Sequence, residues 1–227
     1  MTQSTDHPTN RPIDQSTTRP PDHPTNRPPD QLPIHLFEAG CIQFGTFTLK
    51  SGLTSPIYID LRLLVSDPPL LRGVAQAMAE TAQEIAFDRI AAIPYAGLPI
   101  GVALALELEW PLIYPRREVK EHGTRRAIEG TFHPGETVLL VDDLITRGDS
   151  KLEAIAPLEA AGLTVRDVLV LVDREQGGGE DLAQRGYRLH AVLRLTELLN
   201  VLRKHACITH EQHIEALRYL KPETLKP

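Results

Sequence analysis

The sequence predicts an α/β fold with a doubly wound, mainly parallel sheet flanked by helices. Three observations support this class. From Leu36 onward, short apolar segments alternate with segments of helical periodicity, as in repeated strand–helix units. Residues 137–142 (TVLLVD) form a continuous apolar run, which is typical of strands buried on both faces of a parallel sheet. The chain has 227 residues, which is long enough to bury a substantial core.

The first elements of this pattern are a helix, a strand and a second helix. Ser66, Asp67 and Pro68 supply a cap and an early proline for the first helix. Its apolar face is formed by Leu70, Val74, Met78, Thr81 and Ile85. Residues 89–95 form a short apolar strand, and a turn containing glycine and proline connects it to a helix over residues 102–108.

The rest of the chain repeats this alternation. Strands are expected over residues 111–114, 137–142, 168–172 and 189–195, with a helix over residues 150–161. Gly162 should end that helix, and Pro157 should kink it. Two helices follow, and Thr209 and Gln212 have the spacing of a capping box for the second. Ligands of such folds bind beyond the carboxyl ends of the strands. The loops of interest therefore follow Tyr95, Tyr114, Asp142 and Val172.

The first 33 residues differ in composition from the rest. They are rich in Pro, Thr, Asp, Asn and Gln, and residues 6–15 are nearly duplicated by residues 22–31. With few apolar side chains to bury, this segment is expected to be a disordered, proline-rich tail. The alternative is a docking arm, but it lacks the anchoring aromatic residues of proline-rich ligands. Residues 34–227 should form the folded domain.

Charge and cysteine content exclude several classes of protein. The formal net charge of −6 has the wrong sign for a protein that coats nucleic acid or anionic membranes. Cys41 and Cys207 provide neither a disulfide framework nor the spacing of a metal site, which suits a reducing cytosol. No apolar run is long enough to span a membrane. We therefore expect a cytoplasmic protein without nucleic-acid or membrane partners.

The strongest chemical signal is the segment 138–150, in which an apolar strand leads through two acids into a helix. Gly148 allows close approach of a ligand, and backbone N–H groups at a helix N-terminus bind phosphate. Thr146 and Ser150 add hydroxyl donors. Asp142 and Asp143 can accept hydrogen bonds from ribose hydroxyls or hold the water of a hydrated Mg²⁺. The alternative is that these acids and hydroxyls only cap the helix.

A basic cluster follows the strand at residues 111–114. Its members are Arg116, Arg117, Lys120, Arg125 and Arg126. The cluster lies in an acidic chain and is flanked by glycines, which permit a hinged loop. Cations that close over an anionic group stabilise negative charge that develops in a transition state, and Lys120 and His122 are the best candidates for this role. The alternative is a solvated face on which these cations pair with Glu118 and Glu121.

The segment 138–150 resembles the phosphoribosyl pyrophosphate (PRPP) signature of type I phosphoribosyltransferases. Three further segments are similar to orotate phosphoribosyltransferases. They are residues 47–62, like the N-terminal segment of that family, residues 116–124, like its mobile catalytic loop, and residues 170–177, like the strand whose arginine faces orotate. The resemblance covers residues 36–195 and adds a small N-terminal hood to the expected fold.

The resemblance implies that orotate and PRPP give orotidine 5'-monophosphate and diphosphate, with Mg²⁺, in pyrimidine synthesis. It further implies a homodimer with shared active sites, in which the metal is carried by PRPP rather than by a protein cage. The implied catalytic residues are Lys120, His122, Asp142 and Asp143. The implied PRPP-binding residues are Tyr95, Arg116, Arg117, Lys120, His122, Asp142, Asp143, Leu144, Ile145, Thr146, Arg147, Gly148, Asp149 and Ser150. Ala96 stands where the family has a lysine, and Arg117 where lysine is common.

The resemblance assigns orotate to Lys50, Tyr58, Thr146 and Arg174. Arg174 also suits orotate on chemical grounds, because a guanidinium offers a bidentate fork to a planar carboxylate. From the residues alone, Arg174 could instead pair with Asp173 or Glu175. Lys50 could be a surface lysine, and Tyr58 an outward-facing strand residue.

Two other functions use the same fold. A phosphoribosyltransferase for another base would share the PRPP loop, but Lys50 and Arg174 favour orotate. A regulator that senses PRPP and binds nucleic acid would need an added basic or helix-turn-helix segment, which the sequence lacks. After about residue 196 only two helices are expected, so we expect no decarboxylase domain in this chain.

Overall fold

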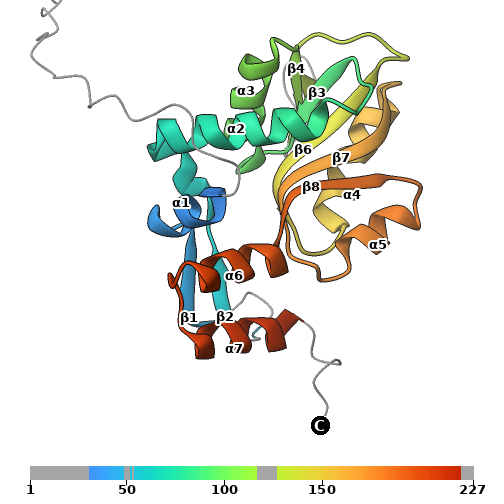
Figure 1. Ribbon diagram of the computed structural model, residues 1–227. Helices are drawn as coiled ribbons and strands as arrows, with labels where there is room; N and C mark the ends of the chain where they lie inside the picture. The colour runs from blue at the N-terminus through green and yellow to red at the C-terminus, as the bar shows by residue number, and fades with distance from the viewer. Residues whose placement is uncertain (1–30, 49–51, 53, 117–126, 221–227) are drawn as a thin grey trace, which may run out of the picture.

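A six-stranded sheet forms the centre of the computed structural model, which describes residues 31–48, 52, 54–116 and 127–220 (Figure 1). Its strand order is β5-β4-β3-β6-β7-β8. The strands are β3 (Arg89–Ala92), β4 (Leu112–Pro115), β5 (Ile128–Glu129), β6 (Thr137–Ile145), β7 (Thr164–Asp173) and β8 (Arg188–Arg194). All neighbouring strands pair in parallel except β5, which is antiparallel to β4. The sheet is therefore mainly parallel, as expected.

Helices cover both faces of this sheet. The helices are α2 (Pro68–Ala82) and α3 (Gly97–Leu108) on one face, and α4 (Asp149–Ala160) and α5 (Gly178–Ala183) on the other. Each strand contributes side chains to the cores on both faces, because successive side chains of a strand point to opposite sides. In β6, Leu139 and Val141 belong to the core under α2 and α3, whereas Val138 and Leu140 belong to the core under α4. This confirms the doubly wound fold.

The strand order reverses between β3 and β6. The chain proceeds from β3 outward to β4 and β5, then crosses back to place β6 on the other side of β3. The loops after β3 and β6 consequently leave the sheet in opposite directions and open a crevice between them. Ligands of open α/β sheets bind at such a point.

A smaller lobe, which we call the hood, packs beside the sheet and is built from both ends of the described chain. Its elements are α1 (Leu32–Glu38), the antiparallel pair β1 (Ile42–Thr48) and β2 (Thr54–Ile59), α6 (Leu195–Lys204) and α7 (His210–Leu220). Figure 1 shows α6 and α7 beside β1 and β2. The expected N-terminal hood therefore includes the two C-terminal helices. A 3-10 helix, η2 (Leu61–Ser66), leads from the hood to α2.

The first helix begins before residue 34, where the folded domain was expected to start. Helix α1 begins at Leu32, and Leu32 and Pro33 are both buried. Residues 1–30 lie outside the described part of the chain. The folded part thus includes the last two residues that the composition assigned to the tail.

Three local expectations can be compared with the structure. The segment 97–101 is the first part of α3 rather than a turn. Strand β6 extends beyond Asp142 to Ile145, because Leu144 and Ile145 still pair with β7. The capping box of α7 is confirmed, since the Thr209 N–H donates to Gln212 at 2.9 Å and the Gln212 N–H donates to Thr209 Oγ1 at 3.1 Å.

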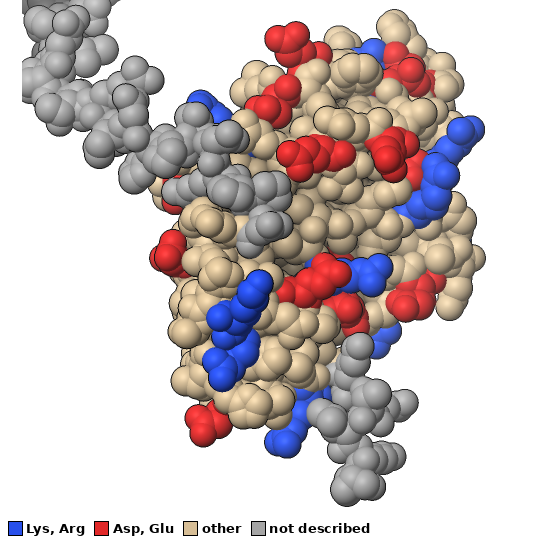
Figure 2. Space-filling view, viewed as in Figure 1, with Lys and Arg blue, Asp and Glu red and all other residues tan. Residues whose placement is uncertain are grey.

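The surface mixes both signs of charge. On the face shown in Figure 2, acidic and basic side chains are interspersed between uncharged areas. Within the described residues, no helix has the length and apolar character needed to cross a membrane.

Candidate active site

A cleft of about 270 Å³ lies at the point where the strand order reverses. Five of the predicted site residues line it, namely Tyr95 after β3, Arg116 after β4, Asp142 and Asp143 in β6, and Ser150 in α4. The topology therefore brings together residues from four separate segments of the chain. Ala96 also lines the cleft, so its small side chain stands at the expected lysine position.

Residues 146–150, which we call the phosphate loop, reach the cleft at Ser150. This loop joins β6 to α4, whose N-cap is Gly148. Backbone N–H groups at a helix N-terminus, together with the helix dipole, favour an anion at this position. Asp149 is exposed. Ile145 is fully buried, and Leu144 packs against the core under α2 and α3, so these two residues can offer a ligand only backbone groups.

The glycines around this loop are needed for packing between elements. A Cβ atom on Gly148 would lie 3.2 Å from Asp181 Cβ, and the Gly148 N–H donates to the Asp181 carboxylate at 3.5 Å. A Cβ on Gly178 would lie 2.5 Å from Ile145 Cγ1. Helix α5 therefore supports the phosphate loop from behind. The sequence analysis missed this role, although the run of glycines at 177–179 is a signal of close backbone approach.

The two adjacent acids have different environments. Asp142 is 6% exposed, and its Oδ1 accepts a hydrogen bond from the Asp143 N–H at 2.9 Å. Asp143 is partly buried, and its Oδ1 accepts from the Leu144 N–H at 2.8 Å. Burial, followed by the negative charge of Asp142, raises the pKa of Asp143 to about 7. Asp143 is thus close to its protonation midpoint near neutral pH.

A buried lysine lies beside the acid pair. Lys151 is 3% exposed, and its Nζ lies 2.7 Å from Asp142 Oδ2. The same Nζ donates to the Leu144 carbonyl and lies 3.4 Å from Ser150 Oγ. Lys151 was missed in the sequence analysis, because a lysine in the first turn of a helix is usually exposed.

Arg174 lies at the end of the neighbouring strand. Its backbone N–H donates to the Ile145 carbonyl at 3.0 Å, which places it next to the start of the phosphate loop. Its Nε is buried and has no hydrogen-bond partner among the described residues. Burial lowers the pKa of Arg174, and Tyr219 of α7 opposes this effect. Such an incompletely satisfied, buried cation is suited to an anionic ligand.

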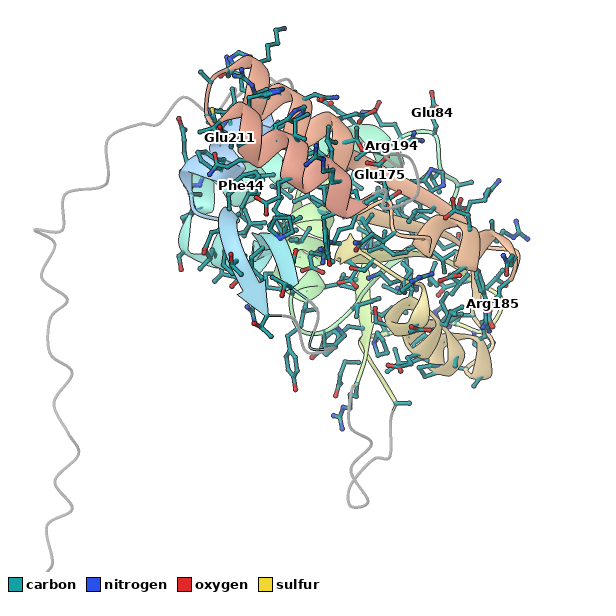
Figure 3. The ribbon with its side chains drawn as sticks, turned by 90° about the horizontal axis from the view of Figure 1, so that it is seen from below. Phe44, Glu84, Glu175, Arg185, Arg194 and Glu211 are labelled. Carbon is teal, nitrogen blue, oxygen red and sulfur yellow. The ribbon has the colours of Figure 1, made fainter. Side chains whose placement is uncertain are left out.

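Glu175 holds the backbone next to Arg174. It has a φ of 55°, and its N–H donates to Asp173 Oδ1 at 2.8 Å. Its own carboxylate accepts a hydrogen bond from the Thr196 N–H at 2.7 Å, at the N-terminus of α6. Figure 3 shows Glu175 beside Arg194 at this junction. The sequence analysis considered Glu175 only as a partner for Arg174, and the structure instead shows it capping α6.

The remaining predicted residues lie apart from the cleft or outside the described residues. Tyr58 stacks on Phe47 in the hood, with ring centroids 5.4 Å apart, and its hydroxyl accepts from Arg62 at 3.0 Å. It is not among the residues that line the cleft. Arg147 in the phosphate loop is exposed. Lys50, Arg117, Lys120 and His122 lie outside the described residues.

Arg116 marks the base of the segment 117–126, which connects β4 to β5. Its N–H donates to the Ala127 carbonyl at 2.7 Å, and its guanidinium forms an ion pair with Glu129. Arg116 therefore lines the cleft with its charge already partnered by an acid.

The described residues contain no group of three or more His, Cys, Asp and Glu side chains that could hold a metal ion. Asp143 can still accept a hydrogen bond from metal-bound water, because it lines the cleft. The donor set is therefore compatible with a metal that arrives with a ligand and has little direct contact with the protein.

Comparisons with known proteins agree with this geometry. The family model described as "Phosphoribosyl transferase domain" matches residues 64–185. Orotate phosphoribosyltransferase of Pyrococcus furiosus is 42% identical over 165 residues, covering 72% of this chain and 91% of the relative. The bifunctional enzyme PyrF/PyrE of a Nostoc species is 44% identical over 189 residues, covering 81% of this chain and 40% of the relative. The chain thus spans less than half the length of that bifunctional relative.

Solved structures show the same relationship. The UMP synthase of Leishmania donovani has a TM-score of 0.80 at 44% identity, covering 86% of this chain and 43% of that chain. The orotate phosphoribosyltransferase of Aeropyrum pernix has a TM-score of 0.69 at 36% identity, covering 78% of this chain and 99% of that chain. On the evidence of its sheet, its cleft and these relatives, the chain belongs to the orotate phosphoribosyltransferase family of type I phosphoribosyltransferases.

Proposed function

We propose that the chain transfers ribose 5-phosphate from PRPP to N1 of orotate, giving orotidine 5'-monophosphate and diphosphate in pyrimidine biosynthesis. The observation that carries this proposal is the juxtaposition of three features at the carboxyl ends of β6 and β7. They are the phosphate loop, the acid Asp143 in the cleft, and the buried Arg174, whose Nε has no hydrogen-bond partner in the described part of the chain. The phosphate loop can bind a phosphate, Asp143 can accept hydrogen bonds from a ribose, and Arg174 can pair with an anionic base.

The reaction needs positioning and charge stabilisation rather than a covalent nucleophile. The ribosyl carbon develops oxocarbenium character as the C1–O bond to diphosphate breaks and the bond to N1 of orotate forms, and the N1 proton is released to water. In this proposal the phosphate loop binds the 5'-phosphate, Asp143 accepts hydrogen bonds from ribose hydroxyls, and Arg174 binds the orotate carboxylate. Lys50 and Tyr58 belong to the orotate site, as the resemblance implies.

The diphosphate gains negative charge as it departs. Arg116, Arg117, Lys120 and His122 are proposed to stabilise this charge from the segment that connects β4 to β5. Mg²⁺ would be carried by the diphosphate and neutralise part of its charge, with Asp143 contacting its water. Tyr95 lies close enough to this part of the cleft to contact PRPP.

A homodimer is supported by an apolar surface on α3. Val102 and Leu106 are four residues apart on this helix and are 42% and 77% exposed, and Trp110 just beyond it is 42% exposed. Exposed apolar patches of this kind mark protein–protein contacts. Leu106 and Trp110 lie toward the amino ends of the sheet, and a second copy docked on this face would bury them. The shared active sites are proposed from the resemblance and not from the position of this surface.

The proposed reaction is tested by an orotate-depletion assay with PRPP and Mg²⁺, run beside adenine, hypoxanthine and uracil. We expect depletion of orotate alone. Depletion of another base with orotate left intact would assign the chain to a different substrate. Lys120→Ala should lower turnover strongly while leaving the melting temperature unchanged.

Shared sites are tested by mixing two damaged chains. Lys120→Ala removes the loop cation, and Arg174→Ala removes the base-binding cation. If each segment 117–126 serves the neighbouring subunit, a refolded equal mixture should recover roughly a quarter of wild-type activity, because about half the dimers then contain one intact site. Activity that stays at the level of the separate variants, with subunit exchange confirmed by mass, would contradict shared sites.

A cytoplasmic location is part of the same proposal. It is supported by the two free cysteines of the chain, of which Cys41 is buried and Cys207 partly buried. Free thiols are typical of reducing compartments. Small-molecule substrates are the proposed partners, without nucleic acid or membrane.

A further inference from the structure

The ion pair between Lys151 and Asp142 lies directly beneath the phosphate loop. Both side chains are more than nine-tenths buried, with exposed fractions of 4% and 8%. Burying an ammonium group is costly unless it is paired and hydrogen-bonded. A positive charge in the first turn of a helix is also disfavoured by the helix dipole. Lys151 therefore depends on Asp142 and the Leu144 carbonyl for its place in the fold.

These contacts join the two ends of the phosphate loop. The Leu144 carbonyl belongs to β6, before the loop, whereas Lys151 belongs to α4, after it. The Lys151 side chain thus bridges from the helix back to the strand. The loop between them, residues 146–150, is held at both ends by a single side chain.

Asp142 is also fixed from two other sides. Its Oδ1 accepts the Asp143 N–H at 2.9 Å, while a Cβ on Gly97 would lie 2.6 Å from that same oxygen. The carboxylate is therefore enclosed between Lys151, its own backbone and the start of α3. Both acids line the cleft, but Asp143 is less buried than Asp142 and its carboxylate has no ion pair among the described residues.

We infer that Lys151 is a positioning residue, whose buried ammonium holds Asp142 and the Leu144 carbonyl so that the phosphate loop keeps a shape ready for phosphate. Asp142 then forms an ion pair within the protein, and Asp143 is the acid that accepts hydrogen bonds from the ribose. This inference rests on the proposed function, since it assigns a division of labour between the two acids of the PRPP site.

The test uses the full-length protein and the variant Lys151→Met, which keeps the length of the side chain but removes its charge and its donors. We measure the Kd for PRPP by calorimetry, the KM values for PRPP and orotate, and the melting temperature. We expect the Kd and KM for PRPP to rise about tenfold or more, because misplacing a binding loop by about 1 Å has effects of this size. The KM for orotate should change much less.

A matched control separates positioning from general destabilisation. Arg188→Met removes one cation from Asp167, which is 2% exposed and lies on β7 away from the cleft. This variant should lower the melting temperature without changing the Kd for PRPP. If Lys151→Met lowers the melting temperature while PRPP binding stays at the wild-type value, the inference is overturned.

A second variant covers the case in which Lys151→Met does not fold. Lys151→Gln keeps a neutral donor for Asp142, and the inference predicts PRPP binding between that of the wild type and that expected for the methionine variant. Unchanged PRPP binding in a folded Lys151→Gln would also overturn it. Failure of the wild type to consume orotate and PRPP would instead contradict the proposed function, so the two failures are distinct.

Discussion

The polar side chains at the two ends of the central sheet differ in how fully they are hydrogen-bonded and ion-paired. At the amino ends, Arg89 pairs with Glu136, and Asp88 Oδ2 accepts a hydrogen bond from the Thr137 N–H at 2.7 Å. Each of these polar groups thus has a hydrogen-bond or ion-pair partner within the protein. At the carboxyl ends, Arg174 keeps a buried Nε that has no partner among the described residues, and Asp143 is held near a neighbouring acid. The carboxyl ends therefore keep an incompletely satisfied cation, which suits the end of the sheet that is proposed to bind the ligands.

Cavity size alone would indicate the opposite end of the sheet. A hollow of about 520 Å³, lined by Phe87, Trp110 and Arg166 among others, lies at the amino ends, whereas the cleft at the carboxyl ends measures about 270 Å³. Phe87 and Trp110 pack edge to face with ring centroids 5.6 Å apart, so the two aromatic rings in this lining contact each other. The chemistry of the lining, rather than its volume, distinguishes the two.

The largest effect is expected at Asp143. Asp143→Asn should lower kcat/KM about 100-fold or more, because it weakens an acceptor for ribose hydroxyls at the reacting centre. Steady-state kinetics with both substrates measure this loss. A near-normal kcat/KM would show that Asp143 does not bind the ribose. It would also weaken the proposal that the carboxyl ends of the sheet bind substrate.

The same variant should change how stability depends on pH. The pKa of Asp143 is raised from 3.8 to about 7 in the folded state. Between these values the folded protein binds more protons than the unfolded chain, so this group lowers stability as pH rises through that window. Thermal melts from pH 4 to 8 should show a flatter decline for Asp143→Asn than for the wild type. An identical pH profile would show that the acid is not buried beside Asp142 as described.

The next effect is expected at Arg174. Arg174→Gln should raise the KM for orotate about 10- to 100-fold, which corresponds to one or two charge-assisted hydrogen bonds. The Kd for PRPP should stay at the wild-type value. The melting temperature should be unchanged or higher, since a buried and incompletely satisfied cation is removed. A rise in the PRPP Kd with no change for orotate would move Arg174 to the other substrate.

A smaller effect is expected at Glu175, where the helix cap and the substrate site meet. Glu175→Ala should cost about 1 kcal/mol of stability through loss of the α6 cap, and it should raise the KM for orotate severalfold by loosening Arg174. Asp67→Ala is the matched control, because Asp67 Oδ1 caps α2 by accepting from the Leu70 N–H at 2.9 Å. Equal changes of KM in both variants would mean that only general stability matters.

The smallest kinetic effect is expected at the amino ends. Arg89 lowers the pKa of Glu136 to about 2, so their pairing stabilises the fold above pH 4.5 and is lost as the pH falls toward 2. Arg89→Met should therefore lose stability at neutral pH and show a weaker dependence on acid, with kcat and both KM values unchanged. Altered kinetics would show that the two ends of the sheet are coupled.

Much of the site follows from local sequence. The apolar run before Asp142, the adjacent acids and the hydroxyls around Gly148 are consecutive residues, so their order fixes a strand, a loop and a helix N-terminus without reference to other segments. The alternation of strands and helices likewise gives the fold class, because each period reflects which faces the element must bury.

Other features required the tertiary structure. The burial of Lys151, the support of Gly148 by α5 and the capping of α6 by Glu175 each depend on residues distant in the chain or on the depth of a side chain in the core. The hood combines the two ends of the described chain because β2 packs against α7. Periodicity reports which face of an element is buried but not which segment buries it, and that choice is made only when the whole chain packs.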